Sequence, residues 1–114
     1  MSNFIKKPWG HEIIWAKTEK YVGKILFIEK GQKLSLQYHQ KKEETITVSK
    51  GLLHFTYGSD TDNLMSHDMK PGDVFHIPTG LVHRMEALED TEVYEVSTPE
   101  LDDVVRLQDD YGRT

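Results

Sequence analysis

Gln37, His39 and Glu44 carry side chains that can bind a metal ion, and they lie on two short segments with the pattern of β-strands. Polar and apolar side chains alternate in residues 34–39, which places Gln37 and His39 on the same face. Residues 44–48 are rich in β-branched side chains, and Glu44 begins that segment. If the two strands pair antiparallel, an amide oxygen, an imidazole and a carboxylate can point at one spot. They form an incomplete set of ligands for a divalent metal.

His83 supplies the fourth member of this set. It follows a short apolar strand, residues 74–77, that lies between two turn signals rich in proline and glycine. Two imidazoles, one amide oxygen and one carboxylate would leave positions open on a divalent cation for water or substrate. The amide oxygen of Gln37 favours a Lewis-acid metal over an oxygen-activating iron, and zinc is the metal that we expect. The alternative is that these are polar residues of a strand edge and histidines that merely pack.

The rest of the chain alternates short strands with turns, and no segment before residue 99 has the 3.6-residue period of a helix. The strands that we expect are 11–15, 21–29, 34–39, 44–48, 52–57, 64–69, 74–77, 81–88 and 91–97. Such short, evenly spaced strands predict an all-β protein, a small antiparallel jelly-roll barrel with the four metal-binding side chains facing its interior. Residues 1–20 would form an N-terminal arm with strands. Residues 99–114 would form a tail that starts with a helical turn and is either disordered or folded back over the barrel.

Composition restricts the class of protein further. A chain of 114 residues without cysteine indicates one domain with neither disulfides nor thiolate metal ligands. The formal net charge of −5 argues against a nucleic acid or an anionic membrane surface as partner. The lack of a long apolar run or a signal-peptide pattern favours a cytoplasmic location.

The two metal-binding segments resemble the paired motifs of the cupin family, G-x5-H-x-H-x3,4-E-x6-G and G-x5-P-x-G-x2-H-x3-N. Eight positions match at the expected spacing, namely Gly31, His39, Glu44, Gly51, Gly72, Pro78, Gly80 and His83. Two positions differ, because Gln37 replaces the first histidine and Ala87 replaces the final asparagine. The resemblance implies a single cupin domain over residues 1–114.

From Lys7 to Arg113 the chain also resembles type II phosphomannose isomerase, the cupin domain that many bacteria carry fused behind a mannose-1-phosphate guanylyltransferase. The resemblance rests on the segments 8–10, 31–39, 77–84 and 102–113. It implies that the metal ligands are Gln37, His39, Glu44 and His83. The family usually has a His-His-His-Arg run followed by Glu-His-Trp, whereas this chain has His-Gln-Lys-Lys at 39–42 and Glu-Thr-Ile at 44–46. The guanylyltransferase activity is not expected in a chain of this length.

The activity that this resemblance implies is metal-dependent aldose–ketose isomerisation of a sugar phosphate, most like that of mannose-6-phosphate isomerase. Such a reaction needs a residue that moves a proton between two carbons. Lys33, four positions before Gln37, and Glu95, on a strand that could turn it inward, are candidates. Arg113 or Arg106 could bind the phosphate, because a guanidinium matches the geometry of phosphate oxygens.

Three other functions remain open. The first is a non-catalytic sugar-binding or regulatory metal-binding cupin in polysaccharide or nucleotide-sugar metabolism. The second is a nucleotide-sugar ketoisomerase or epimerase, which usually relies on a histidine–tyrosine or histidine–aspartate pair and is disfavoured by the intact ligand set. The third is an oxygenase, which Gln37 disfavours.

A homodimer is the oligomeric state that we expect. The segment 21–29 is apolar on both faces, as in a strand that is central in a sheet or covers an interface. A barrel of this size has no room for Phe4, Trp9, Trp15 and Phe27 all inside it. The aromatic side chains that remain outside would form an apolar patch, which usually marks an interface.

Overall fold

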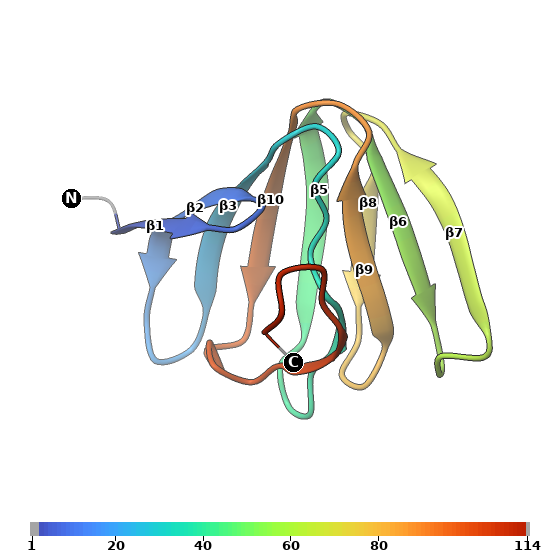
Figure 1. Ribbon diagram of the computed structural model, residues 1–114. Helices are drawn as coiled ribbons and strands as arrows, with labels where there is room; N and C mark the ends of the chain where they lie inside the picture. Colours follow the sequence, from blue (N-terminus) through green and yellow to red (C-terminus); the bar gives the residue numbers. More distant parts are fainter. Residues whose placement is uncertain (1–2, 114) are drawn as a thin grey trace.

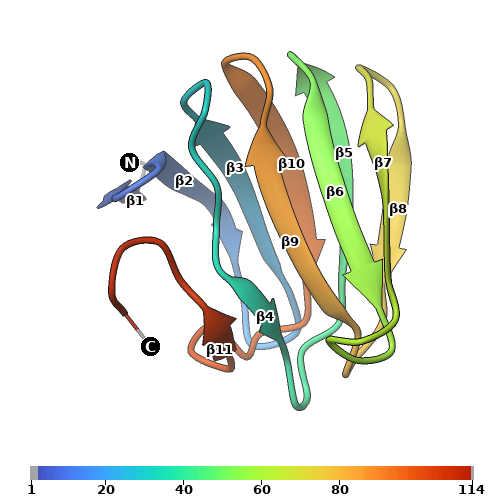
Figure 2. The same ribbon diagram turned by 45° about the vertical axis from the view of Figure 1, so that its right-hand side comes forward.

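The structure, a computed structural model that describes residues 3–113, is built from two antiparallel β-sheets that face each other (Figures 1 and 2). The first sheet has the order β1-β2-β3-β10-β5-β8 and the second the order β11-β4-β9-β6-β7. The strands of the first sheet are β1 (Asn3–Lys7), β2 (Gly10–Lys17), β3 (Val22–Ile28), β10 (Thr91–Ser97), β5 (Glu44–Lys50) and β8 (Val74–Ile77). Those of the second are β11 (Val105–Gln108), β4 (Leu36–Tyr38), β9 (Val82–Ala87), β6 (Leu53–Gly58) and β7 (Leu64–Met69).

This arrangement confirms the prediction of a small antiparallel jelly roll. Most strands fall where the alternation of side chains predicts them, although β4 is shorter than the expected segment 34–39. The N-terminal arm is a hairpin of β1 and β2. In the part of the chain that the structure describes, no helix is long and apolar enough to cross a membrane.

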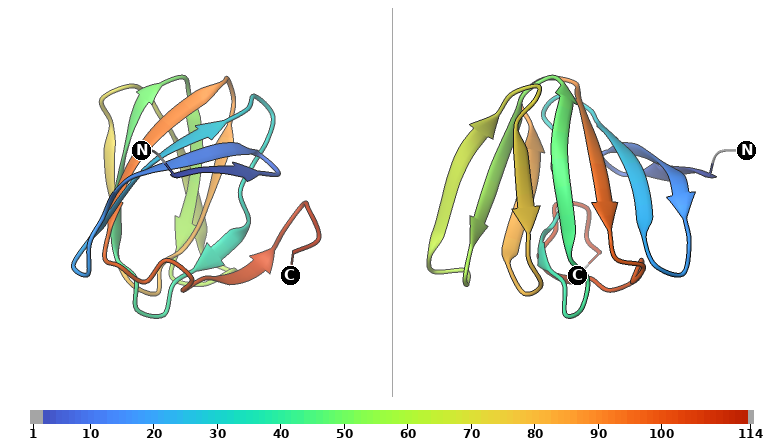
Figure 3. Two further views of the ribbon diagram at one scale, coloured as in Figure 1. Left: turned by 90° about the vertical axis from the view of Figure 1, so that its left-hand side faces the viewer. Right: turned by 180° about the vertical axis from the view of Figure 1, so that it is seen from behind.

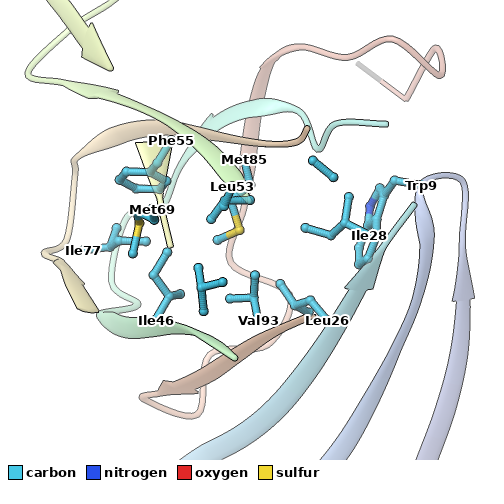
Figure 4. Close-up of a cluster of buried hydrophobic side chains, with 12 residues drawn as sticks. Trp9, Leu26, Ile28, Ile46, Leu53, Phe55, Met69, Ile77, Met85 and Val93 are labelled. Carbon is cyan, nitrogen blue, oxygen red and sulfur yellow. The ribbon is translucent and has the colours of Figure 1, made fainter. Parts of the chain in front are cut away.

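The hydrophobic core fills the space between the two sheets (Figure 4). Ile46 and Val93 from the first sheet meet Leu53, Phe55 and Met85 from the second. Along β5 and β10 every second side chain points into this core, because successive side chains of a strand alternate between its faces. The same rule turns Glu44 and Glu95 inward, at the end of the barrel where the core becomes polar.

Of the four aromatic residues near the N-terminal arm, only Trp9 enters the core. Phe4 and Trp15 are more than half exposed, and Phe27 stacks on His11. The indole of Trp15 lies over Gly23, where any side chain would collide with it. Three aromatic residues are therefore left on the outer surface of the six-stranded sheet.

The C-terminal tail folds back onto the barrel. The expected helical turn after Pro99 is wrong, since residues 101–102 form an isolated turn and the chain then enters β11. β11 pairs with β4, with Arg106 opposite Gln37. The left view of Figure 3 shows this red segment beside β4. The tail thus lies next to the segment that holds two of the expected metal ligands.

Candidate metal centre

Three of the expected ligands converge at one end of the barrel. His39 directly follows β4, Glu44 begins β5, and His83 lies in β9. The Nε2 atoms of His39 and His83 are 3.3 and 3.4 Å from the same oxygen, Oε1 of Glu44. One ligand atom from each residue lies within 4.8 Å of the other two, a separation at which three groups could hold one metal ion.

The hydrogen bonds of the two histidines leave Nε2 available for a metal. Nδ1 of His39 lies 2.6 Å from the carbonyl oxygen of Asp103, and Nδ1 of His83 lies 2.9 Å from that of Leu81. A carbonyl only accepts, so each neutral imidazole carries its proton on Nδ1 and its lone pair on Nε2. Both Nε2 atoms are buried and have no hydrogen-bond partner among the described residues. Two lone pairs and a carboxylate oxygen aimed at one point fit a divalent cation.

Gln37 lies beside these three residues. It is opposite His83 in the pairing of β4 with β9, and it lines the same cavity as His39 and Glu44. Its Oε1 accepts a 2.6 Å hydrogen bond from the hydroxyl of Ser35. An amide oxygen has two lone pairs, so this bond leaves one for a cation. The role of Gln37 as a fourth ligand stays a prediction.

Two further ionisable groups, Lys42 and Glu95, border the ligand set. The ammonium of Lys42 lies 3.2 Å from Oε2 of Glu44 and 3.4 Å from Oε2 of Glu95. Burial opposes a charge on Lys42, but the carboxylates of Glu95 and Glu44 outweigh it and raise the pKa of the ammonium. Burial likewise disfavours the Glu44 carboxylate, yet its pKa lies well below the usual range, and the charge of Lys42 helps to hold it there.

Glu95 has the opposite shift. Burial, followed by repulsion from Glu44, raises the pKa of the Glu95 carboxyl to about 7, although Lys42 and Lys24 act against this. A carboxyl that titrates near neutral pH can both accept and donate a proton. It therefore suits a proton-transfer role beside a metal.

A cavity of about 100 Å³ extends from the ligands toward the C-terminal tail. Its lining includes five cationic side chains, those of Lys7, Lys24, Lys42, Arg106 and Arg113. Most of these already have an anionic partner. Lys7 and Lys24 both pair with Glu12, at 3.2 and 2.9 Å, and Lys42 pairs with Glu44 and Glu95.

The two arginines of the tail differ. The guanidinium of Arg113 donates two hydrogen bonds to Asp109, at 2.8 and 3.0 Å. Nε of Arg106 is buried and has no hydrogen-bond partner among the described residues. Among the described cations that line this cavity, Arg106 is therefore the one without an anionic partner.

The candidate Lys33 and three other ionisable residues lie away from the ligands. Lys33 does not line the cavity, and its ammonium pairs with Asp110 at 3.4 Å. Arg84 also pairs with Asp110, at 3.0 Å, and as the neighbour of His83 in β9 it lies on the opposite face of that strand. His54 and His76 lie on the surface, where they contact Asp68 and Glu43.

The sequence does not single out Lys42 or Asp103 as members of this site. Lys42 occurs in a charged turn and has the pattern of a solvated residue, although the type II phosphomannose isomerases usually have an arginine at this position. Asp103 lies in a run of acidic residues in the tail. Its side chain nonetheless accepts hydrogen bonds from the backbone amides of Gln40, Lys41 and Lys42.

The fold and this ligand arrangement define the class of protein. The family model of the cupin domain matches residues 24–98, and the chain belongs to the cupin family. Among curated proteins, it is 30% identical over 96% of its length to the xanthan biosynthesis protein XanB of Xanthomonas campestris. It is 31% identical, again over 96% of its length, to a mannose-1-phosphate guanylyltransferase of Escherichia coli. The chain spans only 24% and 23% of these two relatives, so about a quarter of each.

Solved structures support the same fold. KdgF from a Halomonas species matches with a TM-score of 0.75 at 20% identity, covering 88% of this chain and 90% of that one. Oxalate decarboxylase from Bacillus subtilis matches with a TM-score of 0.79 at 17% identity, covering 93% of this chain and 30% of that one. At such low identity these likenesses establish the jelly-roll fold alone.

Proposed function

We propose that the protein is a metal-dependent sugar-phosphate isomerase that interconverts an aldose and a ketose, most like mannose-6-phosphate isomerase. The observation that carries the proposal is the convergence of His39, Glu44 and His83 at the end of a polar cavity that Glu95 also lines. With Gln37 they would hold a divalent cation, for which zinc is our first choice. When bound, the cation would supply the Lewis acidity that stabilises negative charge on the oxygen atoms of the sugar.

Glu95 is the residue that would move the proton between the two carbons. Its carboxyl is buried, lines the cavity and has a pKa of about 7, so both protonation states are populated near neutral pH. The ammonium of Lys42 holds it in place at 3.4 Å. Lys33, whose ammonium pairs with Asp110 outside the cavity, is a weaker candidate for this step.

Arg106 would bind the phosphate of the substrate. It lines the cavity, and its Nε has no partner among the described residues, whereas the guanidinium of Arg113 is held by Asp109. A planar guanidinium can give two parallel hydrogen bonds to a phosphate. This geometry favours an anionic substrate over a neutral sugar.

The relatives support a substrate from sugar metabolism. Their names describe xanthan and alginate biosynthesis and the guanylyl transfer to mannose 1-phosphate. Because this chain spans about a quarter of those proteins, the activities in their names do not pass to it as a whole. The cationic side chains of the cavity support the proposal that this substrate is a sugar phosphate. A cytoplasmic location stays a prediction.

The test combines metal content with turnover. The purified protein, loaded with zinc, cobalt or manganese, should interconvert an aldose phosphate and a ketose phosphate, with mannose 6-phosphate as the first substrate. His39→Ala and His83→Ala should each lower the metal content found by elemental analysis and abolish turnover, because the cation loses a ligand. His54→Ala is the matched control, since this histidine lies on the surface against Asp68 and should change neither property.

One result would replace the proposal. If the fully loaded wild-type protein converts no sugar phosphate but still binds one, the protein is a non-catalytic sugar-binding cupin. Loss of ligand binding in His83→Ala would then show that the metal serves recognition.

A further inference from the structure

Asp103 connects the C-terminal tail to the segment that carries the metal ligands. Its carbonyl oxygen accepts the hydrogen bond from Nδ1 of His39 at 2.6 Å. Its carboxylate accepts three more, from the backbone amides of Gln40 at 3.0 Å, Lys41 at 2.6 Å and Lys42 at 2.8 Å. One residue thus contacts both the first histidine ligand and the turn that follows it.

The two histidine ligands differ in how their rings are oriented. His83 is oriented by the carbonyl of Leu81, only two residues before it. His39 is oriented by a carbonyl 64 residues away, which reaches it only if the tail is in place. The hydrogen bond on Nδ1 decides which nitrogen has the lone pair, so the tail controls the ligand atom of His39.

The carboxylate of Asp103 fixes the turn between two ligands. Residues 40–42 join His39 to Glu44, and three successive amides of this turn point at the Asp103 side chain. The hydrogen bond from the amide of Gln40 contributes most to lowering the pKa of the Asp103 carboxyl, and those from Lys42 and Lys41 add to it. Asp103 is therefore ionised at neutral pH. Just before the tail, the backbone amide of Thr98 donates to the carbonyl of Glu43, and the amide of Glu43 donates to the hydroxyl of Thr98, both at 3.0 Å.

We propose that Asp103 is a positioning residue of the metal centre. Its carboxylate anchors the turn from His39 to Glu44, and this anchoring holds its own carbonyl against Nδ1 of His39, so that Nε2 faces the metal. The inference rests on the proposed metal site. Because coupling is reciprocal, a bound cation should stabilise the tail as strongly as the tail favours binding of the cation.

The test uses the full chain with three substitutions. Asp103→Ala removes all three acceptor contacts to the turn, and Asp103→Asn keeps one acceptor oxygen. Asp102→Asn removes the same charge from the adjacent, exposed position. The tautomer of His39 is read from long-range proton–nitrogen spectra of histidine-labelled, metal-free protein at about pH 8, where an ordinary imidazole is neutral. Affinity for zinc is measured by competition with a chelator.

We expect the Asp102→Asn protein to match the wild type, with His39 protonated on Nδ1. In Asp103→Ala, His39 should populate both tautomers while His83 keeps its own, and zinc affinity should fall by roughly 10–100-fold. Asp103→Asn should lie between the two. Zinc should also slow amide exchange in residues 103–108 of the wild type, and less so in Asp103→Ala.

Two results would overturn the inference. One is an unchanged His39 tautomer in Asp103→Ala. The other is a loss of zinc affinity that Asp102→Asn reproduces. If the wild type binds no cation at all, the proposed function fails, and the inferred role in metal binding fails with it. The tautomer spectra then report separately whether Asp103 orients His39.

Discussion

Glu44 and Glu95 share the ammonium group of Lys42, at 3.2 and 3.4 Å, and yet their carboxyl groups have opposite pKa shifts. The pKa of Glu44 lies well below its ordinary value, whereas that of Glu95 is raised to about 7. One buried carboxylate is thus kept ionised beside the histidines, and the other can exchange a proton near neutral pH. Two carboxyl groups separated in this way are suited to different tasks, binding a cation and transferring a proton.

Replacing Lys42 with methionine should destabilise the metal-free protein by about 3–5 kcal/mol, because two buried carboxylates would lose their shared cation. Urea unfolding at neutral pH measures this loss. The loss should shrink when zinc is present, since the metal restores positive charge beside Glu44. Lys50→Met is the control, because Lys50 is exposed and its ion pair with Glu92 is long, at 3.8 Å. An equal effect of both substitutions would contradict the shared-cation interpretation.

The stability of the metal-free protein should depend on pH through Glu95. Its folded-state pKa of about 7 lies above the ordinary value of 4.5, so the folded protein binds this proton more tightly than the unfolded chain. The contribution of Glu95 to stability is therefore greatest below about pH 4.5 and declines as the pH rises to about 7, by on the order of 3 kcal/mol. Glu95→Gln lacks this group, so the difference between its stability and that of the wild type should grow over this interval. Parallel stability curves for the two proteins would show that Glu95 does not titrate there.

The sequence is sufficient to predict which side chains face inward where their orientation depends only on alternation along one strand. Alternation along one strand places Glu44 with the core residues of β5 and Glu95 with those of β10, and no distant contact is needed for this. The convergence of His39 and His83 also follows, because motif spacing implies the barrel that brings their strands together.

The positions of Lys42 and Asp103 could not be predicted, because they depend on contacts between distant segments. Lys42 is buried only because Glu44 and Glu95 meet across two strands of one sheet. The segment after Pro99 does not form the expected helical turn, because Asp103 accepts hydrogen bonds from residues 40–42, about sixty positions away. The secondary-structure propensity of the tail residues cannot predict hydrogen bonds to the backbone amides of a distant turn.

Gly51 and Gly31 provide a matched pair of stability predictions. Both have a positive φ, of 89° and 84°, and an alanine in this conformation costs about 1 kcal/mol. At Gly51 an added methyl group would also collide with the backbone of Asp90 and Thr91, whereas at Gly31 it would meet open space. Gly51→Ala should therefore be destabilised by several kcal/mol more than Gly31→Ala in urea unfolding. Equal losses would mean that the turn at Gly51 relaxes freely.

The outer face of the six-stranded sheet is the surface through which we expect the homodimer to form. Trp15 is 55% exposed and Val96 is 50% exposed, and both lie next to Gly23 on β3. Val96→Asp places a charge in this apolar surface and should convert a dimer into a monomer in sedimentation at micromolar concentration. Met65→Asp, on the other sheet and 61% exposed, is the control and should leave the dimer intact. A wild-type protein that sediments as a monomer would contradict the prediction.

Arg106 and Arg113 should differ in their effect on substrate binding. Arg106→Gln should raise the KM for a sugar phosphate by roughly 10–100-fold, because a charge-assisted hydrogen bond to phosphate contributes about 1.5–3 kcal/mol. Metal content should not change, since Arg106 does not belong to the metal-binding set. Arg113→Gln should have a smaller effect, because its guanidinium already donates two hydrogen bonds to Asp109. Steady-state kinetics and elemental analysis of both variants make the comparison. If Arg113→Gln raises KM more than Arg106→Gln does, then Arg113 leaves Asp109 when substrate binds, and it is the residue that holds the phosphate.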